Sequence, residues 1–496
     1  MAVGNEYIAL ATSPTTTDEF EDLPPAVVYK KFPFDIKSTV SRPRYLFILL
    51  IPLLLIISFS FRPSRSNIIP EPIQPDENPY FWTGKIWDHN DEVAAMLDRC
   101  SALGLLRNTS SPLDPLSPEE ESELIAQGCG TNQTTVIVLA SMWFSEAYSG
   151  TSTAGETIYA QSVISTLNAY HYSYVFSCLG WYNPDMSKTI ELWEKHALNA
   201  RMILVSPVQV NECWNNGHCV KTADYPEGIP AWKMLSLWYW DDPGNPLGPQ
   251  FTLSPSPRNP NHFLSFSIEP TCHRLPYLAS HLRASPPQAY LLAKQVHYLD
   301  DTPEFSWTLP ALAALKHKFG IQVVGGMQDD DEVTREAVKK TGLTNLGKLD
   351  KIEFYEQLAT SFVLLGVGRP RISPSPWDAL CMGVPFINPI LSWDESDPTN
   401  RTKWHAQQWH MTDLDPPYVY SVQAHDLDAL NQAVKAALDH PIDSYIPDYM
   451  RFDFVCERMA QVVEGDWKNV AEVLLEERTT SGDGAVSAAR QQGRMC

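Results

Sequence analysis

Residues 364–389 read LLGVGRPRISPSPWDALCMGVPFINP, and the fold class can be predicted from this stretch. It opens with an apolar run that ends at Gly366 and Gly368, as expected of a buried parallel strand that turns into a loop. Ser375 then suits the N-cap of a helix, and Pro376 suits its first position. Strand, loop and helix in this order are the repeating unit of α/β folds. The stretch therefore predicts part of a doubly wound parallel sheet.

The same helix start could bind a nucleotide. Free backbone N–H groups at a helix N-terminus attract a diphosphate. The carboxylate of Asp378, one turn into the predicted helix, can accept hydrogen bonds from ribose hydroxyls. Asp378 can equally complete a capping box, and it would then only stabilise the helix. Spacing alone leaves both roles open.

The alternation of strands and helices continues on both sides of this stretch. In the earlier part, short apolar runs predict strands at 134–141, 173–179 and 202–205, separated by helices at 156–170 and 187–198. In the later part, strands are predicted at 289–293, 321–325, 361–366 and 384–388, with helices near 308–318, 331–340, 350–359 and 376–382. Two Rossmann-like domains, 131–285 and 286–475, are expected to face a cleft, because ligands of such folds bind at the carboxyl ends of the strands.

An uncharged apolar segment lies far upstream, at residues 45–61. At 1.5 Å per residue it would form about 25 Å of helix, enough to cross a thin bilayer. Lysines and arginines gather before it, so the cytosolic side is predicted for residues 1–44 and the lumenal side for all that follows. The proline-rich start of residues 62–130 predicts a stem. Residues 476–496 are small and polar, and we expect disorder there.

Covalent features agree with a lumenal catalytic region. All nine cysteines follow the predicted span, in a compartment where disulfides persist. Candidate disulfides join Cys100 to Cys129 and Cys213 to Cys219. The three N-glycosylation sequons also follow the span, at Asn108, Asn132 and Asn400.

Charge and metal-binding patterns narrow the function. With 37 Lys and Arg against 59 Asp and Glu, the net charge of −22 argues against a nucleic-acid partner. Asp329–Asp331 formally matches an acidic metal-binding motif, although capping of the following helix explains it as well. A zinc site at Cys213, His218 and Cys219 would lack a second pair of ligands.

The stretch 364–389 resembles the nucleotide-sugar half of glycosyltransferase family 18. That family shows a similar strand, glycines, Pro-x-Pro, an acidic residue before Ala, a Gly and a final Phe-x-Asn-Pro. This chain supplies Gly366, Gly368, Pro374, Pro376, Asp378, Ala379, Gly383, Phe386, Asn388 and Pro389. Asp378 stands where the family usually carries Glu. The resemblance continues through 426–459 and back to 261–269, and it covers roughly 131–475 overall.

The resemblance implies a GT-B fold, a UDP-GlcNAc donor, inversion at the anomeric carbon and no metal cofactor. It also implies a Golgi type II membrane protein, anchored by one helix, whose acceptor is a glycan or glycoprotein. We therefore expect an enzyme, a β-N-acetylglucosaminyltransferase. The alternative is an inactive relative that binds a glycan or nucleotide sugar as a lumenal scaffold.

The family also points to a catalytic carboxylate. Its Gly-Glu pair at the start of the first helix corresponds to Gly155-Glu156. Inversion needs a base that takes the proton of the attacking acceptor hydroxyl, and a carboxylate at a cleft-facing helix start suits that role. The alternative is again a capping box, formed by Thr153 and Glu156.

Without a metal, the leaving diphosphate needs other positive charge. Lys294 follows the predicted strand 289–293 and is one candidate. Lys403 and Arg401 lie in the loop after Pro389, where the family places a donor-contacting lysine, although its local pattern is not reproduced here.

Overall fold

A computed structural model describes residues 81–110, 115–149, 154–177, 186–241, 243–258, 260–272, 282–328 and 332–481. The predicted cytosolic tail and the apolar span at 45–61 lie outside the described residues. Within the described ranges, none of the helices combines the length and hydropathy that a bilayer crossing needs. The described residues from Thr83 onward belong to one compact unit.

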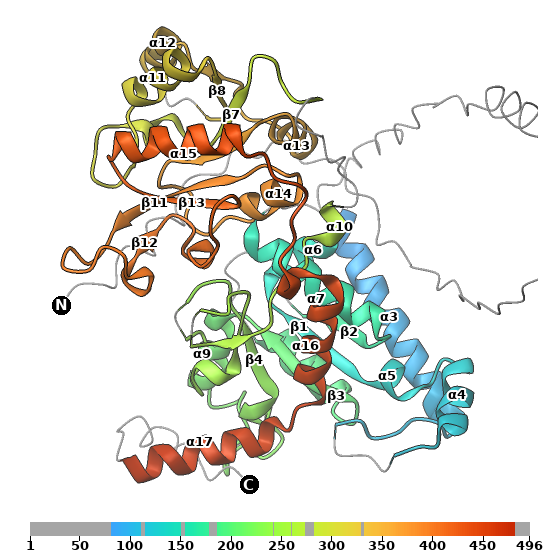
Figure 1. The fold of residues 1–496 in the computed structure, drawn as a ribbon. Coiled ribbons are helices and arrows are strands. Elements are labelled where there is room, and N and C mark those ends of the chain that lie inside the picture. Colours follow the sequence, from blue (N-terminus) through green and yellow to red (C-terminus); the bar gives the residue numbers. More distant parts are fainter. Residues whose placement is uncertain are drawn as a thin grey trace, which may run out of the picture. The chain divides into compact units, whose positions relative to one another are not determined.

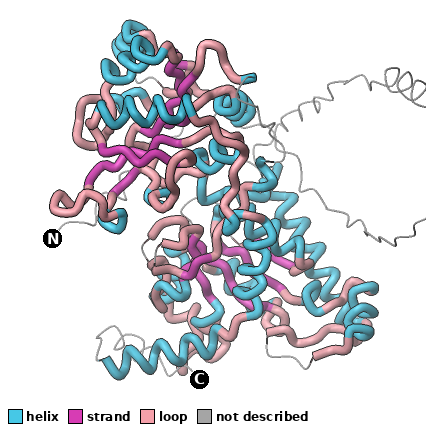
Figure 2. The backbone as a smooth tube through the Cα atoms, in the orientation of Figure 1, coloured by secondary structure: helices cyan, strands magenta, loops and turns pink. Residues whose placement is uncertain are grey.

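The first half is built on a parallel sheet whose strand order is β2-β1-β3-β4-β5-β6 (Figures 1 and 2). Its strands are β1 (Val136–Ala140), β2 (Ser173–Phe176), β3 (Ala200–Val205), β4 (Met234–Leu237), β5 (Thr252–Ser254) and β6 (His262–Phe263). The helices among them are α5 (Thr131–Thr134), α6 (Met142–Ser149), α7 (Gly155–Ala169), α8 (Ser187–Lys195), α9 (Pro207–Asn215), η1 (Ala231–Lys233) and η2 (Pro249–Phe251). Every residue of β1 is buried, because helices cover a parallel sheet on both faces.

The second half has its own sheet, ordered β12-β11-β10-β7-β8-β9, with β13 also paired to β11. Its strands are β7 (Gln288–Leu292), β8 (Gln322–Gly325), β9 (Thr344–Asn345), β10 (Val363–Gly366), β11 (Phe386–Ser392), β12 (His405–Ala406) and β13 (Val419–Gln423). All pairs are parallel except β11 with β12. The helices are η4 (Val296–Leu299), α11 (Leu309–Phe319), α12 (Glu332–Thr341), α13 (Lys351–Ala359), α14 (Ser375–Cys381), η5 (Arg401–Lys403), η6 (Trp409–Met411), α15 (Leu427–Asp439) and η7 (Asp448–Met450). Helix α10 (Glu269–Cys272) comes before β7 and is counted with the first half. An α/β architecture with two Rossmann-like parts is thus confirmed.

The stretch 364–389 folds as the end of β10, a loop, α14 and the start of β11. One detail differs from the prediction: the N-cap is Pro374, and Ser375 is the first helical residue. The Ser375 hydroxyl lies 3.1 Å from that of Ser373, and the Ser375 N–H donates to the Ser373 Oγ at 3.3 Å. Ser375 therefore turns back toward Ser373 and does not cap the helix.

The expected stem ends earlier than predicted, because helix α3 (Phe81–Ala102) packs on the first sheet. The side chain of Asn90 donates to the Phe176 carbonyl at 2.8 Å and accepts from the Phe176 N–H at the same distance. Ile86 and Leu97 of this helix are buried. A short helix, α4 (Pro118–Ala126), follows it. The described part of 81–130 therefore belongs with the first half.

The last two helices, predicted with the second sheet, pack on the first half (Figure 1). They are α16 (Phe452–Glu464) and α17 (Trp467–Ser481). Glu269 accepts the N–H of Phe452, the first residue of α16, at 2.7 Å and so satisfies a backbone donor at the start of that helix. Arg201 of β3 donates to the Val463 carbonyl at 2.8 Å. Helix α17 also extends into the predicted C-terminal tail.

Among the described residues, three cysteine pairs lie at disulfide distance. Cys100–Cys129 and Cys213–Cys219 have Cα–Cα separations of 5.7 and 5.2 Å, in agreement with the candidate pairs. The third pair, Cys272–Cys381, has a Cα–Cα separation of 5.9 Å and joins α10 to α14. Its two cysteines are 109 residues apart, so local spacing gives no hint of it.

Candidate active site

Glu156 lies in the first turn of α7, at the carboxyl edge of the first sheet. The N-cap of α7 is Ala154, which makes no side-chain cap hydrogen bond. The alternative capping box would need Thr153 at that position, and Thr153 lies outside the described residues. With Ala154 as N-cap, the capping box of Thr153 and Glu156 is not formed, and the role of Glu156 as a base stays a prediction.

The surroundings of Glu156 change its acidity. Burial raises the pKa of the Glu156 carboxyl, while its own backbone N–H, the charge of Lys294 and a hydrogen bond from the Trp240 side chain act in the opposite direction. A raised pKa makes a carboxylate a stronger base, and the hydrogen bond from Trp240 orients it. Lys294 follows β7 of the second half, so this residue brings charge from that half to Glu156.

Tyr239 is a buried residue next to Glu156 that the sequence argument missed. It follows β4 and is 3% exposed. A Cβ added to Gly155 would lie 2.7 Å from the Tyr239 ring and 2.8 Å from its hydroxyl oxygen, so the Gly of the Gly-Glu pair makes room for this side chain. The signal available was weak: three consecutive aromatic residues, 238–240, follow an apolar run.

Asp378 lies in α14 and is 5% exposed. The Tyr355 hydroxyl donates to its Oδ2 at 3.4 Å. Burial, and then the negative charge of Asp378, raise the pKa of Tyr355. Asp378 thus sits in a buried polar environment beneath the loop that starts at Gly366.

The two candidate carboxylates act on one hydroxyl group. Burial raises the pKa of Tyr239, and the charges of Glu156 and of Asp378 raise it further. Glu156 comes from the first half and Asp378 from the second. Tyr239 therefore marks the place where the two predicted functional residues lie within electrostatic range of a common neighbour.

The two glycines of the loop have packing roles. A Cβ on Gly366 would lie 2.6 Å from Pro389 and would also collide with the Gln407 side chain. Gly368 has φ +106°, which side chains rarely adopt, and a Cβ there would lie 2.9 Å from the Glu304 carbonyl oxygen. Pro376 is buried inside α14. Contact of these residues with a donor stays a prediction.

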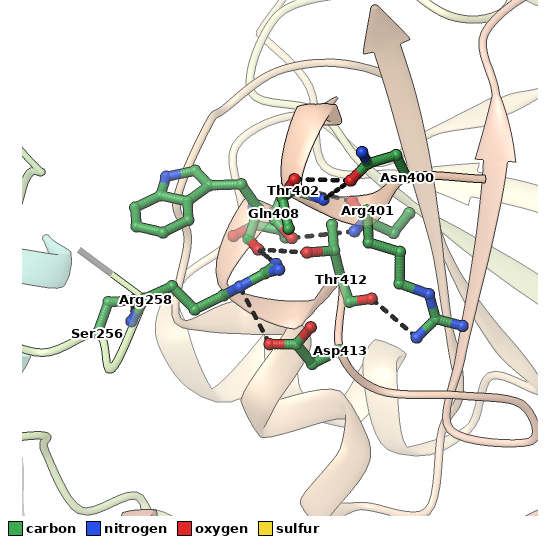
Figure 3. A network of polar contacts seen from close by, with 10 residues as sticks. Ser256, Arg258, Asn400, Arg401, Thr402, Gln408, Thr412 and Asp413 are labelled. Carbon is green, nitrogen blue, oxygen red and sulfur yellow. Dashed lines mark hydrogen bonds and ion pairs between the residues drawn. The ribbon is translucent and has the colours of Figure 1, made fainter. Parts of the chain in front are cut away.

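The other two candidate cations have different neighbours. Lys403 is exposed on η5, and its charge acts on Asp394. Arg401 donates to the Thr412 carbonyl at 3.2 Å (Figure 3) and pairs with Asp415. The described contacts bring Lys294 to Glu156, and they bring neither Lys403 nor Arg401 to either carboxylate.

Metal-binding candidates find little support among the described residues. No group of three or more His, Cys, Asp or Glu side chains in those residues is arranged to hold an ion. The zinc alternative fails because Cys213 is paired with Cys219. Asp329–Asp331 lies outside the described residues.

The three sequons differ in conformation. In two of them the asparagine Oδ1 accepts from the hydroxyl two residues on: Asn108 from Ser110 at 2.8 Å and Asn400 from Thr402 at 2.6 Å (Figure 3). Asn132 instead donates its Nδ2 to the Tyr170 carbonyl at 3.0 Å. The acceptor amide is therefore open in the first two and engaged with the fold in the third.

Comparison with known proteins agrees with the resemblance. The profile of glycosyltransferase family 18 matches residues 255–469. Alpha-1,6-mannosylglycoprotein 6-beta-N-acetylglucosaminyltransferase A of Cricetulus griseus is 28% identical over 126 residues, which are 24% of this chain and 16% of that protein. The human enzyme B is 25% identical over 126 residues, 24% of this chain and 15% of that protein. The match thus spans a small part of these relatives.

Solved structures give weaker likenesses. AviGT4, a glycosyltransferase involved in Avilamycin A biosynthesis, aligns with a TM-score of 0.38 and 12% identity over 70% of this chain and 98% of its own. UDP-GlcNAc 2-epimerase of Methanocaldococcus jannaschii aligns with a TM-score of 0.37 and 9% identity over 66% and 99%. The profile match over residues 255–469 agrees with the resemblance of this part of the chain to glycosyltransferase family 18.

Proposed function

We propose that this chain is an inverting glycosyltransferase of the GT-B type, which transfers N-acetylglucosamine from UDP-GlcNAc to a glycan or glycoprotein. One observation carries the proposal: the profile of glycosyltransferase family 18 matches residues 255–469, which contain Asp378 in the second half, while Glu156 starts α7 in the first half beside Tyr239. A base from one half and a nucleotide ligand from the other are what transfer between two bound substrates requires.

In the proposed reaction Glu156 is the general base. The acceptor hydroxyl oxygen attacks the anomeric carbon of the donor while its proton passes to Glu156. The bond from that carbon to the diphosphate oxygen breaks, and UDP leaves with the electron pair. The hydrogen bond from Trp240 holds the carboxylate in place, and partial burial makes it more basic.

On the donor side, Asp378 is proposed to accept hydrogen bonds from ribose hydroxyls. Asp378 lies in α14, which follows β10, and ligands of such folds bind at the carboxyl ends of the parallel strands. Lys294 is proposed to stabilise the leaving diphosphate, since it follows the neighbouring strand β7 and already acts on Glu156.

The decisive experiment is UDP release by the purified full-length chain in detergent. UDP-GlcNAc is offered with a panel of glycan acceptors that starts with the mannosylglycoprotein class named by the relatives. We expect acceptor-dependent UDP release that persists in EDTA. Binding of UDP without turnover on any acceptor would favour the inactive scaffold. Loss of activity in EDTA and recovery with Mn²⁺ would bring Asp329–Asp331 back as a metal site.

We further propose a single-pass type II membrane protein of the Golgi, with the catalytic region in the lumen. The support is the basic flank before residues 45–61 and the sequons after them. A tag at residue 1 should be accessible to protease in sealed microsomes, and a tag after residue 480 should be protected. The opposite pattern would reverse the orientation.

A further inference from the structure

Arg258 lies between β5 and β6, in the first half, and contacts a turn of the second half. Its Nε pairs with Asp413 Oδ2 at 3.0 Å, and its Nη1 donates to the Trp409 carbonyl oxygen at 3.0 Å (Figure 3). The side chain of Arg258 is only 19% exposed, whereas that of Asp413 is 63% exposed. The backbone N–H of Arg258 donates to the Ser256 Oγ at 3.2 Å, which steadies the base of the arginine. Arg258 thus holds the turn 409–413 at two points.

Two buried glutamines directly precede this turn and hold the loop that leads to Asp378. Gln407 accepts the Gly368 N–H at 2.9 Å and donates to the Pro370 carbonyl at 3.1 Å. Gln408 accepts the Ser373 N–H at 2.8 Å and donates to the same carbonyl at 3.3 Å. Gln407 is fully buried and Gln408 is 2% exposed. The loop backbone is therefore fixed by side chains from another segment, since water cannot replace these partners.

Asn388 completes the arrangement from strand β11. Its Nδ2 donates to the Gln408 carbonyl, and its Oδ1 accepts the Gln408 N–H, both at 2.9 Å. This pair fixes the backbone of Gln408 on one side, while Arg258 fixes the next residue, Trp409, on the other. A shift of the turn would therefore move the glutamine side chains and the loop amides that they bind.

We propose that Arg258 is a positioning residue for donor binding, which fixes the loop 367–374 through the turn 409–413 and the two glutamines. The inference rests on the proposed donor site at Asp378. In this proposal Arg258 of the first half helps to shape the donor site, whose proposed ligand Asp378 belongs to the second half. Removing the guanidinium should loosen the loop without touching any group that contacts the reacting atoms.

The test compares two arginines that both reach across the molecule. Arg258→Met removes the contacts with the turn. Arg451→Met is the matched control, because Arg451 pairs with Glu269 of the first half at 3.2 Å and neither belongs to the turn or the loop. Hydrogen–deuterium exchange is followed in peptides covering 366–375, with no donor added. We expect exchange about ten-fold faster in R258M, the effect of losing a charge-assisted hydrogen bond, and parental rates in R451M.

Kinetics give a second readout on the same variants. In R258M the KM for UDP-GlcNAc should rise about ten-fold while kcat at saturating donor stays within about two-fold, because the donor still orders the loop. Arg258→Lys should recover part of the loss. Asp413→Asn removes only the exposed ion pair with Arg258, so it should also accelerate hydrogen–deuterium exchange of the loop, but by less than R258M does. This variant replaces R258M in the test if R258M does not fold.

Two results would overturn the inference: parental exchange of the loop in both R258M and D413N, or equal acceleration in R258M and R451M. Failure of the proposed function looks different. In that case the parent protein would not bind UDP, although R258M would still accelerate loop exchange.

Discussion

The two candidate carboxylates sit in similar local settings and have opposite surroundings. Glu156 and Asp378 both lie in the first turn of a helix, although α14 directly follows strand β10 whereas α6 stands between strand β1 and α7. Glu156 is partly buried and lies within electrostatic range of Lys294. The N-cap of its helix, Ala154, makes no side-chain hydrogen bond. Asp378 is deeply buried against Tyr355, in a helix joined to α10 by the Cys272–Cys381 pair.

This difference assigns different chemistry to similar positions. A base must change its protonation state in each turnover, so it needs a shifted pKa and access to its partner. A ligand for a neutral ribose needs a fixed position. The surroundings of Glu156 fit the first requirement, and those of Asp378 fit the second.

The largest expected effect separates the two residues directly. Glu156→Gln keeps the size and most hydrogen bonding of the side chain, but it cannot take a proton. Turnover should fall by about 10²–10⁴-fold. UDP affinity, measured by calorimetry, should stay at the parental value because the other half binds the nucleotide.

Near-parental turnover of E156Q would show that Glu156 is structural. The nearest alternative is then Glu146 of α6, whose Oε2 accepts from the Thr157 hydroxyl at 3.1 Å. Glu146→Gln is the variant to compare.

The second prediction tests how firmly the Asp378 region is held. Serine at both Cys272 and Cys381 opens a link between residues 109 positions apart, for which loop-closure entropy predicts a loss of about 4–5 kcal/mol. The matched control, serine at Cys213 and Cys219, opens a link of 6 positions and should cost about 2 kcal/mol by the same relation. Denaturant unfolding measures both, and equal losses would contradict the role of the long link.

The third prediction concerns the donor. Asp378→Asn should weaken UDP binding by about 1–3 kcal/mol, the contribution of a charged hydrogen bond. Tyr355→Phe removes the hydroxyl neighbour of Asp378 but keeps its ring, and it should change UDP affinity less. Calorimetry checks both variants. An unchanged affinity in D378N would leave Asp378 with a purely structural role.

The smallest expected effect is a shift in pH dependence. The base works deprotonated, so kcat/KM should fall as the pH drops through the raised pKa of Glu156. Lys294 lowers that pKa, so Lys294→Met should move the acid limb to higher pH. Lys435→Met, which loses an exposed ion pair with Asp439, is the control and should leave the limb in place.

The same shift has a consequence for folding. Because the folded pKa of Glu156 lies above its unfolded value, its contribution to stability is complete below the unfolded pKa. That contribution is lost as the pH rises through the folded pKa. Glu156→Gln should therefore flatten the pH dependence of unfolding in that window, as followed by thermal melts.

Local patterns in the sequence were enough to predict several features. The order of strand, loop and helix in 364–389 was predicted because burial, glycines and a proline at a helix start act over a few residues. The Cys213–Cys219 pair spans a short turn and could be proposed from spacing. Glu156 and Asp378 were named because the resemblance to a family marks positions along the chain.

Only the tertiary structure shows which residues that are distant in the sequence lie next to one another. Tyr239 lies beside Gly155, Cys272 beside Cys381, and helix α16 beside α7, although long stretches of chain separate the members of each pair. Such contacts depend on the shapes and charges of whole packed elements, which a local pattern does not encode. Helix α16 is held on the first half by contacts such as those of Glu269 with the Phe452 N–H and of Arg201 with the Val463 carbonyl, which no spacing rule predicts.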